Sequence, residues 1–161
     1  MKKKKKTKVL FISSTGGHLS EMLRLSPMFE KYDYHIITEK TKSNLSLRDK
    51  YPGKVDYLVY GTKKNFLVYP FKLLYNTFKS LFFYLKFRPK VIITTGTHTA
   101  GPMCIIGKLF GSKIIYIETL ANMKTKTATG KIIYHFADLF VVQWEGMLKL
   151  YPKAKYWGMI Y

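Results

Sequence analysis

The sequence is poor in acidic residues and cysteine, and it has no long apolar run. Its 161 residues hold 9 Asp and Glu against 28 Lys and Arg, which is a net charge of +19. This excess favours contact with polyanions such as nucleic acid, anionic lipid or phosphorylated substrates. The single cysteine, Cys104, excludes a disulfide framework and a cysteine-rich zinc site. No stretch of about 18 apolar residues exists, so no transmembrane helix is expected.

Several catalytic signatures are missing as well. There is no Asp-x-Asp pair, no His-Glu-x-x-His motif and no cluster of His and acidic residues, so no metal site is expected. The Gly-x-Ser-x-Gly elbow of serine hydrolases is also absent. The basic run Lys2–Lys6 resembles the start of a signal peptide, but the apolar run behind it, residues 9–12, is too short for one.

What the sequence does contain is an alternation of short Val- and Ile-rich runs with longer helical patterns. This order is typical of a parallel sheet covered by helices on both faces. We expect one α/β domain over residues 8–161, a Rossmann-like parallel sheet, preceded by a basic tail at residues 1–7. Strands are expected at 8–13, 34–38, 55–60, 90–95, 113–117 and 138–142, and helices at 18–30, 69–87, 101–110, 126–136 and 145–150.

Ligands of such sheets bind at the carboxyl ends of the strands. The first strand is followed by Ser14, Thr15, Gly16, Gly17 and His18 at the start of a helix. Paired glycines allow a tight turn, and a helix N-terminus attracts phosphate. The loop is neither a G-x-G-x-x-G motif nor a P-loop, so it is either an ordinary turn or a phosphate-binding loop. The histidine is a structural residue, a diphosphate ligand or a general base.

A second loop of small residues, Gly96 to Pro102, follows the strand at 90–95. Its Thr97 and Thr99 are either helix caps or ligand contacts, and His98 lies between them. After the next strand comes Glu118, the only acid in residues 57–137, a range that holds twelve basic residues. This carboxylate either pairs with a lysine or binds a ligand in the cleft.

Residues 63–90 form an aromatic and basic segment with seven cations and no acid. Three lysines recur every seven residues, and Asn76 and Ser80 fall on the same side of the expected helix, giving a narrow polar stripe. The segment is the crossover helix of the sheet, an interfacial membrane anchor, or both. It is too apolar to read a nucleic-acid groove. The residues expected at the membrane are Lys72, Phe78, Lys79, Phe82, Phe83 and Lys86.

Five segments in this order resemble a known family. They are Ser14–His18 with Glu21–Leu23, Gly96–Thr97 with Gly101–Pro102, Ile114–Glu118, Asp138–Trp144, and Tyr151–Ala154. Together they resemble the acceptor-side, membrane-recruiting subunit of the two-component UDP-N-acetylglucosamine transferase. The homologues of that subunit in bacterial capsule and exopolysaccharide synthesis are more similar still. The resemblance runs from about Lys8 to the C-terminus.

The resemblance implies the N-terminal half of a GT-B glycosyltransferase that is inverting, metal-independent and free of cofactors. A separate donor-binding chain would supply the C-terminal half and the UDP-sugar site. The acceptor, a polyprenyl-diphosphate-linked monosaccharide, would be held by Ser14, Thr15, Gly16, Gly17, His18, Gly96, Thr97 and His98. The Gly96 loop and Glu118 would line the same cleft, and the catalytic base would be His18 or Glu118. The partner chain would dock at Trp157, Ile160 and Tyr161.

The eukaryotic pattern also has an N-terminal transmembrane helix, which this sequence lacks. We therefore expect peripheral attachment to the cytoplasmic face of the cell membrane through the basic run and residues 63–90. The expected function is addition of the second sugar in capsular or exopolysaccharide synthesis. The alternatives are a non-catalytic membrane scaffold that only recruits the donor-binding subunit, and a stand-alone nucleotide- or nucleic-acid-binding domain.

Overall fold

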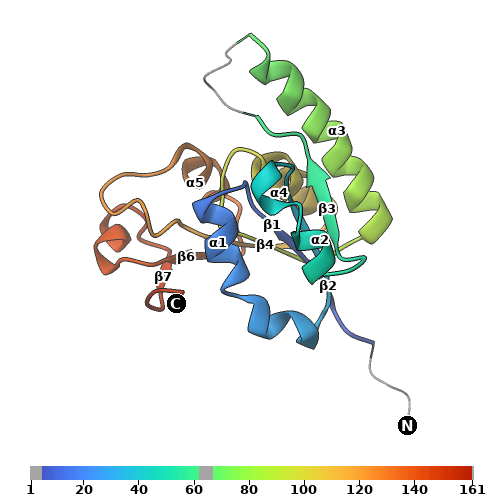
Figure 1. Cartoon of the computed structure of the whole chain (residues 1–161). Helices are drawn as coiled ribbons and strands as arrows, with labels where there is room; N and C mark the ends of the chain where they lie inside the picture. The colour runs from blue at the N-terminus through green and yellow to red at the C-terminus, as the bar shows by residue number, and fades with distance from the viewer. Residues whose placement is uncertain (1–4, 62–66, 161) are drawn as a thin grey trace.

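The chain folds around one parallel sheet (Figure 1), and its computed structural model describes residues 5–61 and 67–160. Within these residues the sheet has seven strands in the order β3-β2-β1-β4-β5-β6-β7, and every neighbouring pair is parallel. The strands are β1 (Lys8–Ile12), β2 (Asp33–Glu39), β3 (Val55–Leu58), β4 (Val91–Thr94), β5 (Lys113–Ile117), β6 (Leu139–Val142) and β7 (Lys155–Tyr156).

Helices connect the strands and cover both faces of the sheet. They are α1 (Gly17–Leu23), α2 (Leu47–Lys50), α3 (Tyr69–Phe87), α4 (Ala100–Leu109) and α5 (Ala128–Ile133), with 3₁₀ helices η1 (Ser26–Lys31), η2 (Lys42–Asn44) and η3 (Glu145–Lys149). Leu10 and Ile12 of β1 pack in one core cluster with residues of α3, α4 and α5. Val9 and Phe11 pack in a second cluster with residues of α1, α2 and η1. Successive side chains of a strand point to opposite faces, so a strand buried on both faces is apolar throughout.

The expected helix at 18–30 is wrong in extent. It ends at Leu23, and a 3₁₀ helix begins at Ser26 with Pro27 in its first turn. Proline has no backbone N–H to donate and disfavours helical geometry in the residue before it, so the apolar spacing cannot continue as one α-helix. The short elements α2, η2 and β7 were not expected from the sequence, because two to four residues carry no clear periodicity.

The long helix expected at 69–87 is α3, but its orientation corrects the sequence interpretation. Asn76 and Ser80 do not lie in an outer polar stripe: they are buried, and the Asn76 side chain bonds both the N–H and the C=O of Val59, at 2.9 and 2.8 Å. Phe83, expected at a membrane, is 7% exposed and packs in the core. These residues share one side of the helix because they are four and seven positions apart.

The opposite side of α3 carries exposed apolar side chains and is free of other described elements (Figure 1). Phe78 and Phe82 are 65% and 61% exposed. The exposed apolar residues of this helix, together called the outer α3 face, are Phe71, Leu74, Tyr75, Phe78, Phe82 and Leu85. No helix in the described part of the chain is long and apolar enough to cross a bilayer.

Candidate functional site

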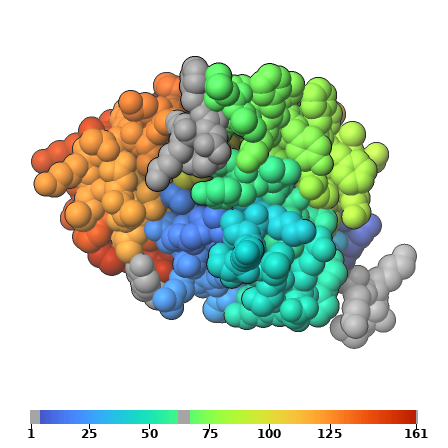
Figure 2. Space-filling model, turned by 45° about the horizontal axis from the view of Figure 1, so that its top comes forward, coloured from blue at the N-terminus to red at the C-terminus, as the bar shows by residue number. Residues whose placement is uncertain are grey.

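A cavity of about 750 Å³ lies beside the carboxyl ends of β1, β2 and β4. Its polar lining comes from the ends of these strands and the segments that follow them, and its apolar lining comes from α3, α4 and α5. Figure 2 shows the orange part of the chain, which includes α5, on one side of this face and the green α3 on the other, with the blue N-terminal part below. The main residues of the polar side are Ser14, Thr15, His18, Glu39, Thr97 and His98. Those of the apolar side are Leu73, Pro102, Ile105, Ile132 and Ile133. The two predicted loops therefore meet in one cavity.

The imidazole of His18 is held by a hydrogen bond through one of its two nitrogens. Nδ1 lies 2.8 Å from the carbonyl oxygen of Thr95, and the Thr95 hydroxyl donates to the His18 carbonyl at 2.7 Å. A carbonyl oxygen can only accept, so Nδ1 carries the hydrogen and the neutral ring keeps its lone pair on Nε2. This is the tautomer that a general base on Nε2 requires.

Gly96 stands between this histidine and the core. Its φ is +94°, and a Cβ there would lie 3.3 Å from the Tyr116 hydroxyl and 3.6 Å from the His18 ring. Both the backbone conformation and the close approach favour glycine. Gly96, Gly16 and Gly17 are not among the residues lining the cavity, and their contact with a diphosphate stays a prediction.

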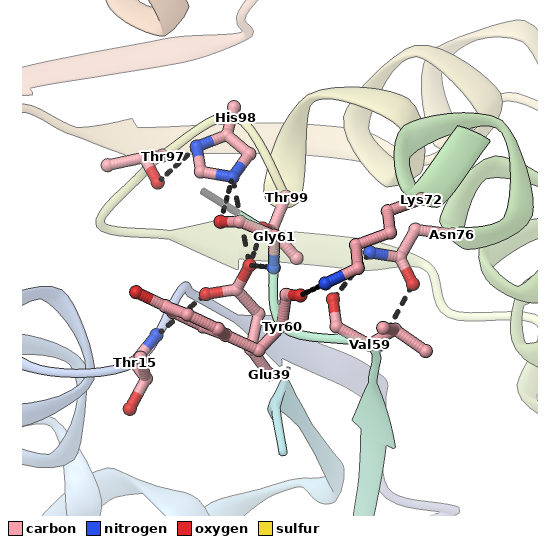
Figure 3. A network of polar contacts seen from close by, with 10 residues as sticks. All are labelled: Thr15, Glu39, Val59, Tyr60, Gly61, Lys72, Asn76, Thr97, His98 and Thr99. Carbon is pink, nitrogen blue, oxygen red and sulfur yellow. Dashed lines mark hydrogen bonds and ion pairs between the residues drawn. The ribbon is translucent and has the colours of Figure 1, made fainter. Parts of the chain in front are cut away.

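His98 is oriented by the segment after β3. Its Nε2 donates to the carbonyl of Gly61 at 3.2 Å, and the Thr97 hydroxyl lies 3.3 Å from its Nδ1 (Figure 3). The ring also packs against Tyr69 of α3, with centroids 5.4 Å apart. His98 therefore links the second loop to α3 at the cavity wall.

Glu39, at the end of β2, is a lining residue that the sequence reasoning missed. It is 1% exposed, and its carboxylate accepts hydrogen bonds from Thr99, Gly61 and Thr15 (Figure 3). The hydroxyl of Thr99 therefore bonds this carboxylate and does not cap the N-terminus of α4. The available signal was an acid directly after the expected strand, which was expected to end one residue earlier, at Thr38.

Glu118 does not line the cavity, contrary to expectation. It is 1% exposed and accepts from the hydroxyls of Thr127 at 3.0 Å and Tyr151 at 2.8 Å and from the backbone N–H of Thr119 at 3.1 Å. Burial, together with the charge of this carboxylate, raises the pKa of the Tyr116 and Tyr151 hydroxyls, which keeps both as neutral donors. The carboxylate fastens the segment between β5 and α5 instead of facing a ligand.

The remaining predicted contacts divide between surface and core. Trp157 is 69% exposed, as a docking residue requires. Ile160 instead packs on the second core cluster, and its N–H donates to Gln143 at 3.0 Å. Tyr161 lies outside the described residues. Across residues 5–61 and 67–160 no group of three or more His, Cys, Asp or Glu is placed to hold a metal ion.

Two curated relatives of this chain carry the same name. The UDP-N-acetylglucosamine transferase subunit ALG14 of Homo sapiens is 27% identical over 94% of this chain and 82% of its own length. That of Kluyveromyces lactis is 31% identical over 96% of this chain and 79% of its own length. These alignments include both loops of the cavity, because they cover nearly the whole chain.

Solved structures match the fold over less than half of their own length. MurG from Acinetobacter baumannii has a TM-score of 0.68 at 18% identity and covers 87% of this chain, which spans 42% of MurG. UDP-N-acetylglucosamine 2-epimerase from Rickettsia bellii has a TM-score of 0.69 at 15% identity, over 96% of this chain and 45% of the epimerase. The expected Rossmann-like parallel sheet is thus confirmed.

A family model described as "Oligosaccharide biosynthesis protein Alg14 like" matches residues 61–160. It covers more than half of the chain and includes the second loop and the α5 wall of the cavity. The chain therefore belongs to the Alg14-like family of oligosaccharide biosynthesis proteins.

Proposed function

We propose that this chain is the acceptor-binding subunit of a two-component glycosyltransferase that extends a polyprenyl-diphosphate-linked sugar. The observation that carries the proposal is the cavity with one polar and one apolar side. Such an acceptor has the same division: a charged, hydroxyl-rich head and an apolar chain. The volume of the cavity lies within the range of about 300–1,000 Å³ usual for ligand sites.

The polar side would hold the diphosphate and sugar, and the apolar side would hold the first isoprene units. Among the described lining residues only His18 and His98 can carry a positive charge. Ser14, Thr15 and Thr97 add hydroxyl donors. The apolar wall of α4 and α5 continues to Leu73 of α3, so a bound polyprenyl chain would leave the cavity near the outer α3 face.

His18 would act as the general base. Its Nε2 accepts the proton of the acceptor hydroxyl while the hydroxyl oxygen bonds the anomeric carbon of the donor sugar. The bond from that carbon to UDP breaks in the same step, which inverts the anomeric configuration. The UDP-sugar would be held mainly by the donor-binding partner, and no metal or other cofactor is assigned a part. The buried bonds of Glu118 make it the weaker candidate for the base.

The outer α3 face would lie against the cytoplasmic face of the membrane, flanked by Lys72, Lys79 and Lys86. Each cation near anionic lipid contributes about 1 kcal/mol. The more specific assignment, to bacterial capsule or exopolysaccharide synthesis, is supported by the motif resemblance alone; the two curated relatives described above are eukaryotic.

The direct test is reconstitution with the donor-binding chain. The two chains are co-expressed and supplied with UDP-N-acetylglucosamine and polyprenyl-diphosphate-linked N-acetylglucosamine on vesicles, and disaccharide product is measured. We expect transfer that needs both chains. Transfer by the donor-binding chain alone at the same rate would contradict the proposal.

The alternatives have separate outcomes in the same system. Full transfer by His18→Ala and by Glu118→Ala would support a non-catalytic scaffold. Nanomolar binding of DNA or RNA that persists at about 0.2 M salt would support a nucleic-acid-binding domain, since purely electrostatic binding weakens steeply there.

A further inference from the structure

The carboxylate of Glu39 joins three segments that follow different strands. Oε1 accepts from the Thr99 hydroxyl at 2.6 Å, at the start of α4, and from the Gly61 N–H at 3.3 Å, after β3. Oε2 accepts from the Thr15 N–H at 3.4 Å, after β1. In Figure 3 these donors surround the carboxylate, with His98 above it and Thr15 on the other side.

His98 is part of the same arrangement. Its Nε2 lies 3.7 Å from Oε1 of Glu39. The same nitrogen donates to the carbonyl of Gly61, and the N–H of Gly61 donates to the Glu39 carboxylate. Glu39 is therefore linked to His98 in two ways. One is the direct contact of 3.7 Å, and the other runs through Gly61, whose N–H donates to Glu39 and whose carbonyl accepts from His98.

A second set of bonds fixes the segment after β2 against the first loop. Asn44 donates to the carbonyl of Glu39 at 2.7 Å and to the Thr15 hydroxyl at 3.3 Å, and the hydroxyls of Thr15 and Thr41 are 3.2 Å apart. The side chain of Asn44 thus links the Glu39 backbone to the loop that carries His18. A buried carboxylate with no donors is very unfavourable, so these bonds are required for the fold of this region as well.

We propose that Glu39 is a positioning residue that sets the polar side of the cavity for the acceptor head. This inference rests on the proposed function above. Glu39 is not assigned the role of base, because both of its oxygens are already occupied by protein donors and its residue surface is nearly closed to solvent. Glu39 sets the distance between the Thr15 backbone on one side and Gly61 and His98 on the other. A bound diphosphate-sugar must fit this distance.

The test compares Glu39→Gln with Thr99→Val in the two-chain complex. Glutamine keeps the size of the side chain, and its amide oxygen still accepts from Thr99 and Gly61, but its NH₂ cannot accept from the Thr15 N–H. Thr99→Val keeps the shape of the Thr99 side chain but removes its hydroxyl, which makes the shortest of the three hydrogen bonds to the Glu39 carboxylate. We expect each variant to raise KM for the polyprenyl-diphosphate-linked acceptor about tenfold, with KM for the UDP-sugar unchanged.

Asp138→Asn is the matched control for loss of stability. Asp138 is an acid whose bonds to Lys108, Lys113 and Ile114 lie at the amino end of β6, away from the cavity. We expect it to lower stability without changing either KM. Hydrogen exchange adds a measurement that does not depend on transfer. The amide of Thr15 should exchange faster in Glu39→Gln than in the wild type, whereas the amide of Gly61, whose acceptor the glutamine keeps, is the internal reference.

The outcomes separate this inference from the proposed function. An active wild-type complex with unchanged acceptor KM in both variants would overturn the positioning role. Unchanged exchange at the Thr15 amide in Glu39→Gln would overturn it too. A wild-type complex without any transfer would overturn the proposed function. A transfer pH profile that loses one limb in Glu39→Gln would make Glu39 an acid–base catalyst and overturn a positioning role.

Discussion

His18 and Glu118 show how two residues at strand ends come to differ in chemistry. His18 lines the cavity and is fixed through Nδ1, so its Nε2 is available to a ligand. Glu118 has its oxygens bonded to Thr127, Tyr151 and Thr119 inside the protein. A candidate base needs a lone pair that faces the cavity. His18 has one and Glu118 does not, and this difference matters more than the type of residue.

We expect His18→Gln to lower kcat of the two-chain complex by about 100-fold or more, since general bases contribute roughly 10²–10⁴ in rate. The unfolding free energy should change little, because the ring is partly exposed and glutamine can still donate to Thr95. Transfer assays and urea denaturation measure the two effects.

Glu118→Gln provides the contrast for that experiment. We expect it to lower the unfolding free energy by about 1–3 kcal/mol, because an amide NH₂ would face hydroxyl and N–H donors in a buried site. A fall in kcat as large as that of His18→Gln, in a variant that remains folded, would restore Glu118 as the base.

At the scale of elements, Asp138 joins α4, β5 and β6 at the amino end of the sheet. Burial alone would raise its pKa, but hydrogen bonds from the Ile114 N–H and from Lys108 and Lys113 outweigh this and lower the pKa to about 2. The folded state thus binds this proton less readily than the unfolded chain does. The stabilisation is complete above about pH 4 and is lost as the pH falls toward 2.

We predict that Asp138→Asn removes this pH dependence. The variant should be less stable than the wild type by about 1–2 kcal/mol near neutral pH. The loss is moderate because both lysines reach solvent, which weakens their interaction with Asp138. The difference should narrow as the pH falls from 4 to 2. Urea denaturation at several pH values tests it, and an equal difference at pH 2 and pH 7 would rule out the carboxylate as the cause.

The two sides of α3 have opposite requirements. The buried side uses Asn76 to satisfy the N–H and C=O of Val59, just past the end of β3. The residues of the outer α3 face, among them Phe78 and Phe82, are exposed to solvent instead of packing in the core. Substitution on the outer face should therefore change binding while leaving the fold intact.

We predict that Phe78→Ser with Phe82→Ser weakens binding to anionic vesicles at least tenfold, as does Lys72→Glu with Lys79→Glu and Lys86→Glu. The control for charge is Lys149→Glu with Lys153→Glu and Lys155→Glu, three exposed lysines near β7. It makes the same change in net charge and should bind more strongly than the α3 lysine variant. Co-sedimentation measures binding, and equal losses would mean that net charge, not α3, directs the protein to lipid.

At the scale of the whole molecule, the C-terminal segment presents an apolar surface beyond the last strand. Trp157 is exposed next to β7, whereas Ile160 packs on the second core cluster. Exposed tryptophan is typical of the centre of protein interfaces. This placement supports docking of the partner chain at Trp157.

We predict that Trp157→Ala reduces co-purification of the donor-binding chain at least tenfold and leaves thermal unfolding of the isolated chain unchanged. Ile160→Ala is the comparison: it should lower the unfolding temperature, because it removes buried apolar contact. Normal co-purification with Trp157→Ala would place the partner elsewhere.

Much of the fold could be predicted from the sequence because burial on both faces of a parallel sheet requires continuous apolar runs, and these are visible without coordinates. The same reasoning located the two loops of the cavity, since parallel strands bring their carboxyl ends to one edge. It missed Glu39, because a single acid at a strand end reads like a surface residue until its three donors are known.

The sequence by itself determined the class of fold, the edge of the sheet that carries the site, and the excess of positive charge. Only the tertiary structure decided which polar groups face the cavity and which side of α3 faces the sheet. Helical periodicity separates the sides of a helix but does not orient them. Here Asn76 faces inward because its amide pairs the N–H and C=O of Val59, just past the end of β3. Likewise, the positions of their donors directed Glu39 to the cavity and Glu118 to the core.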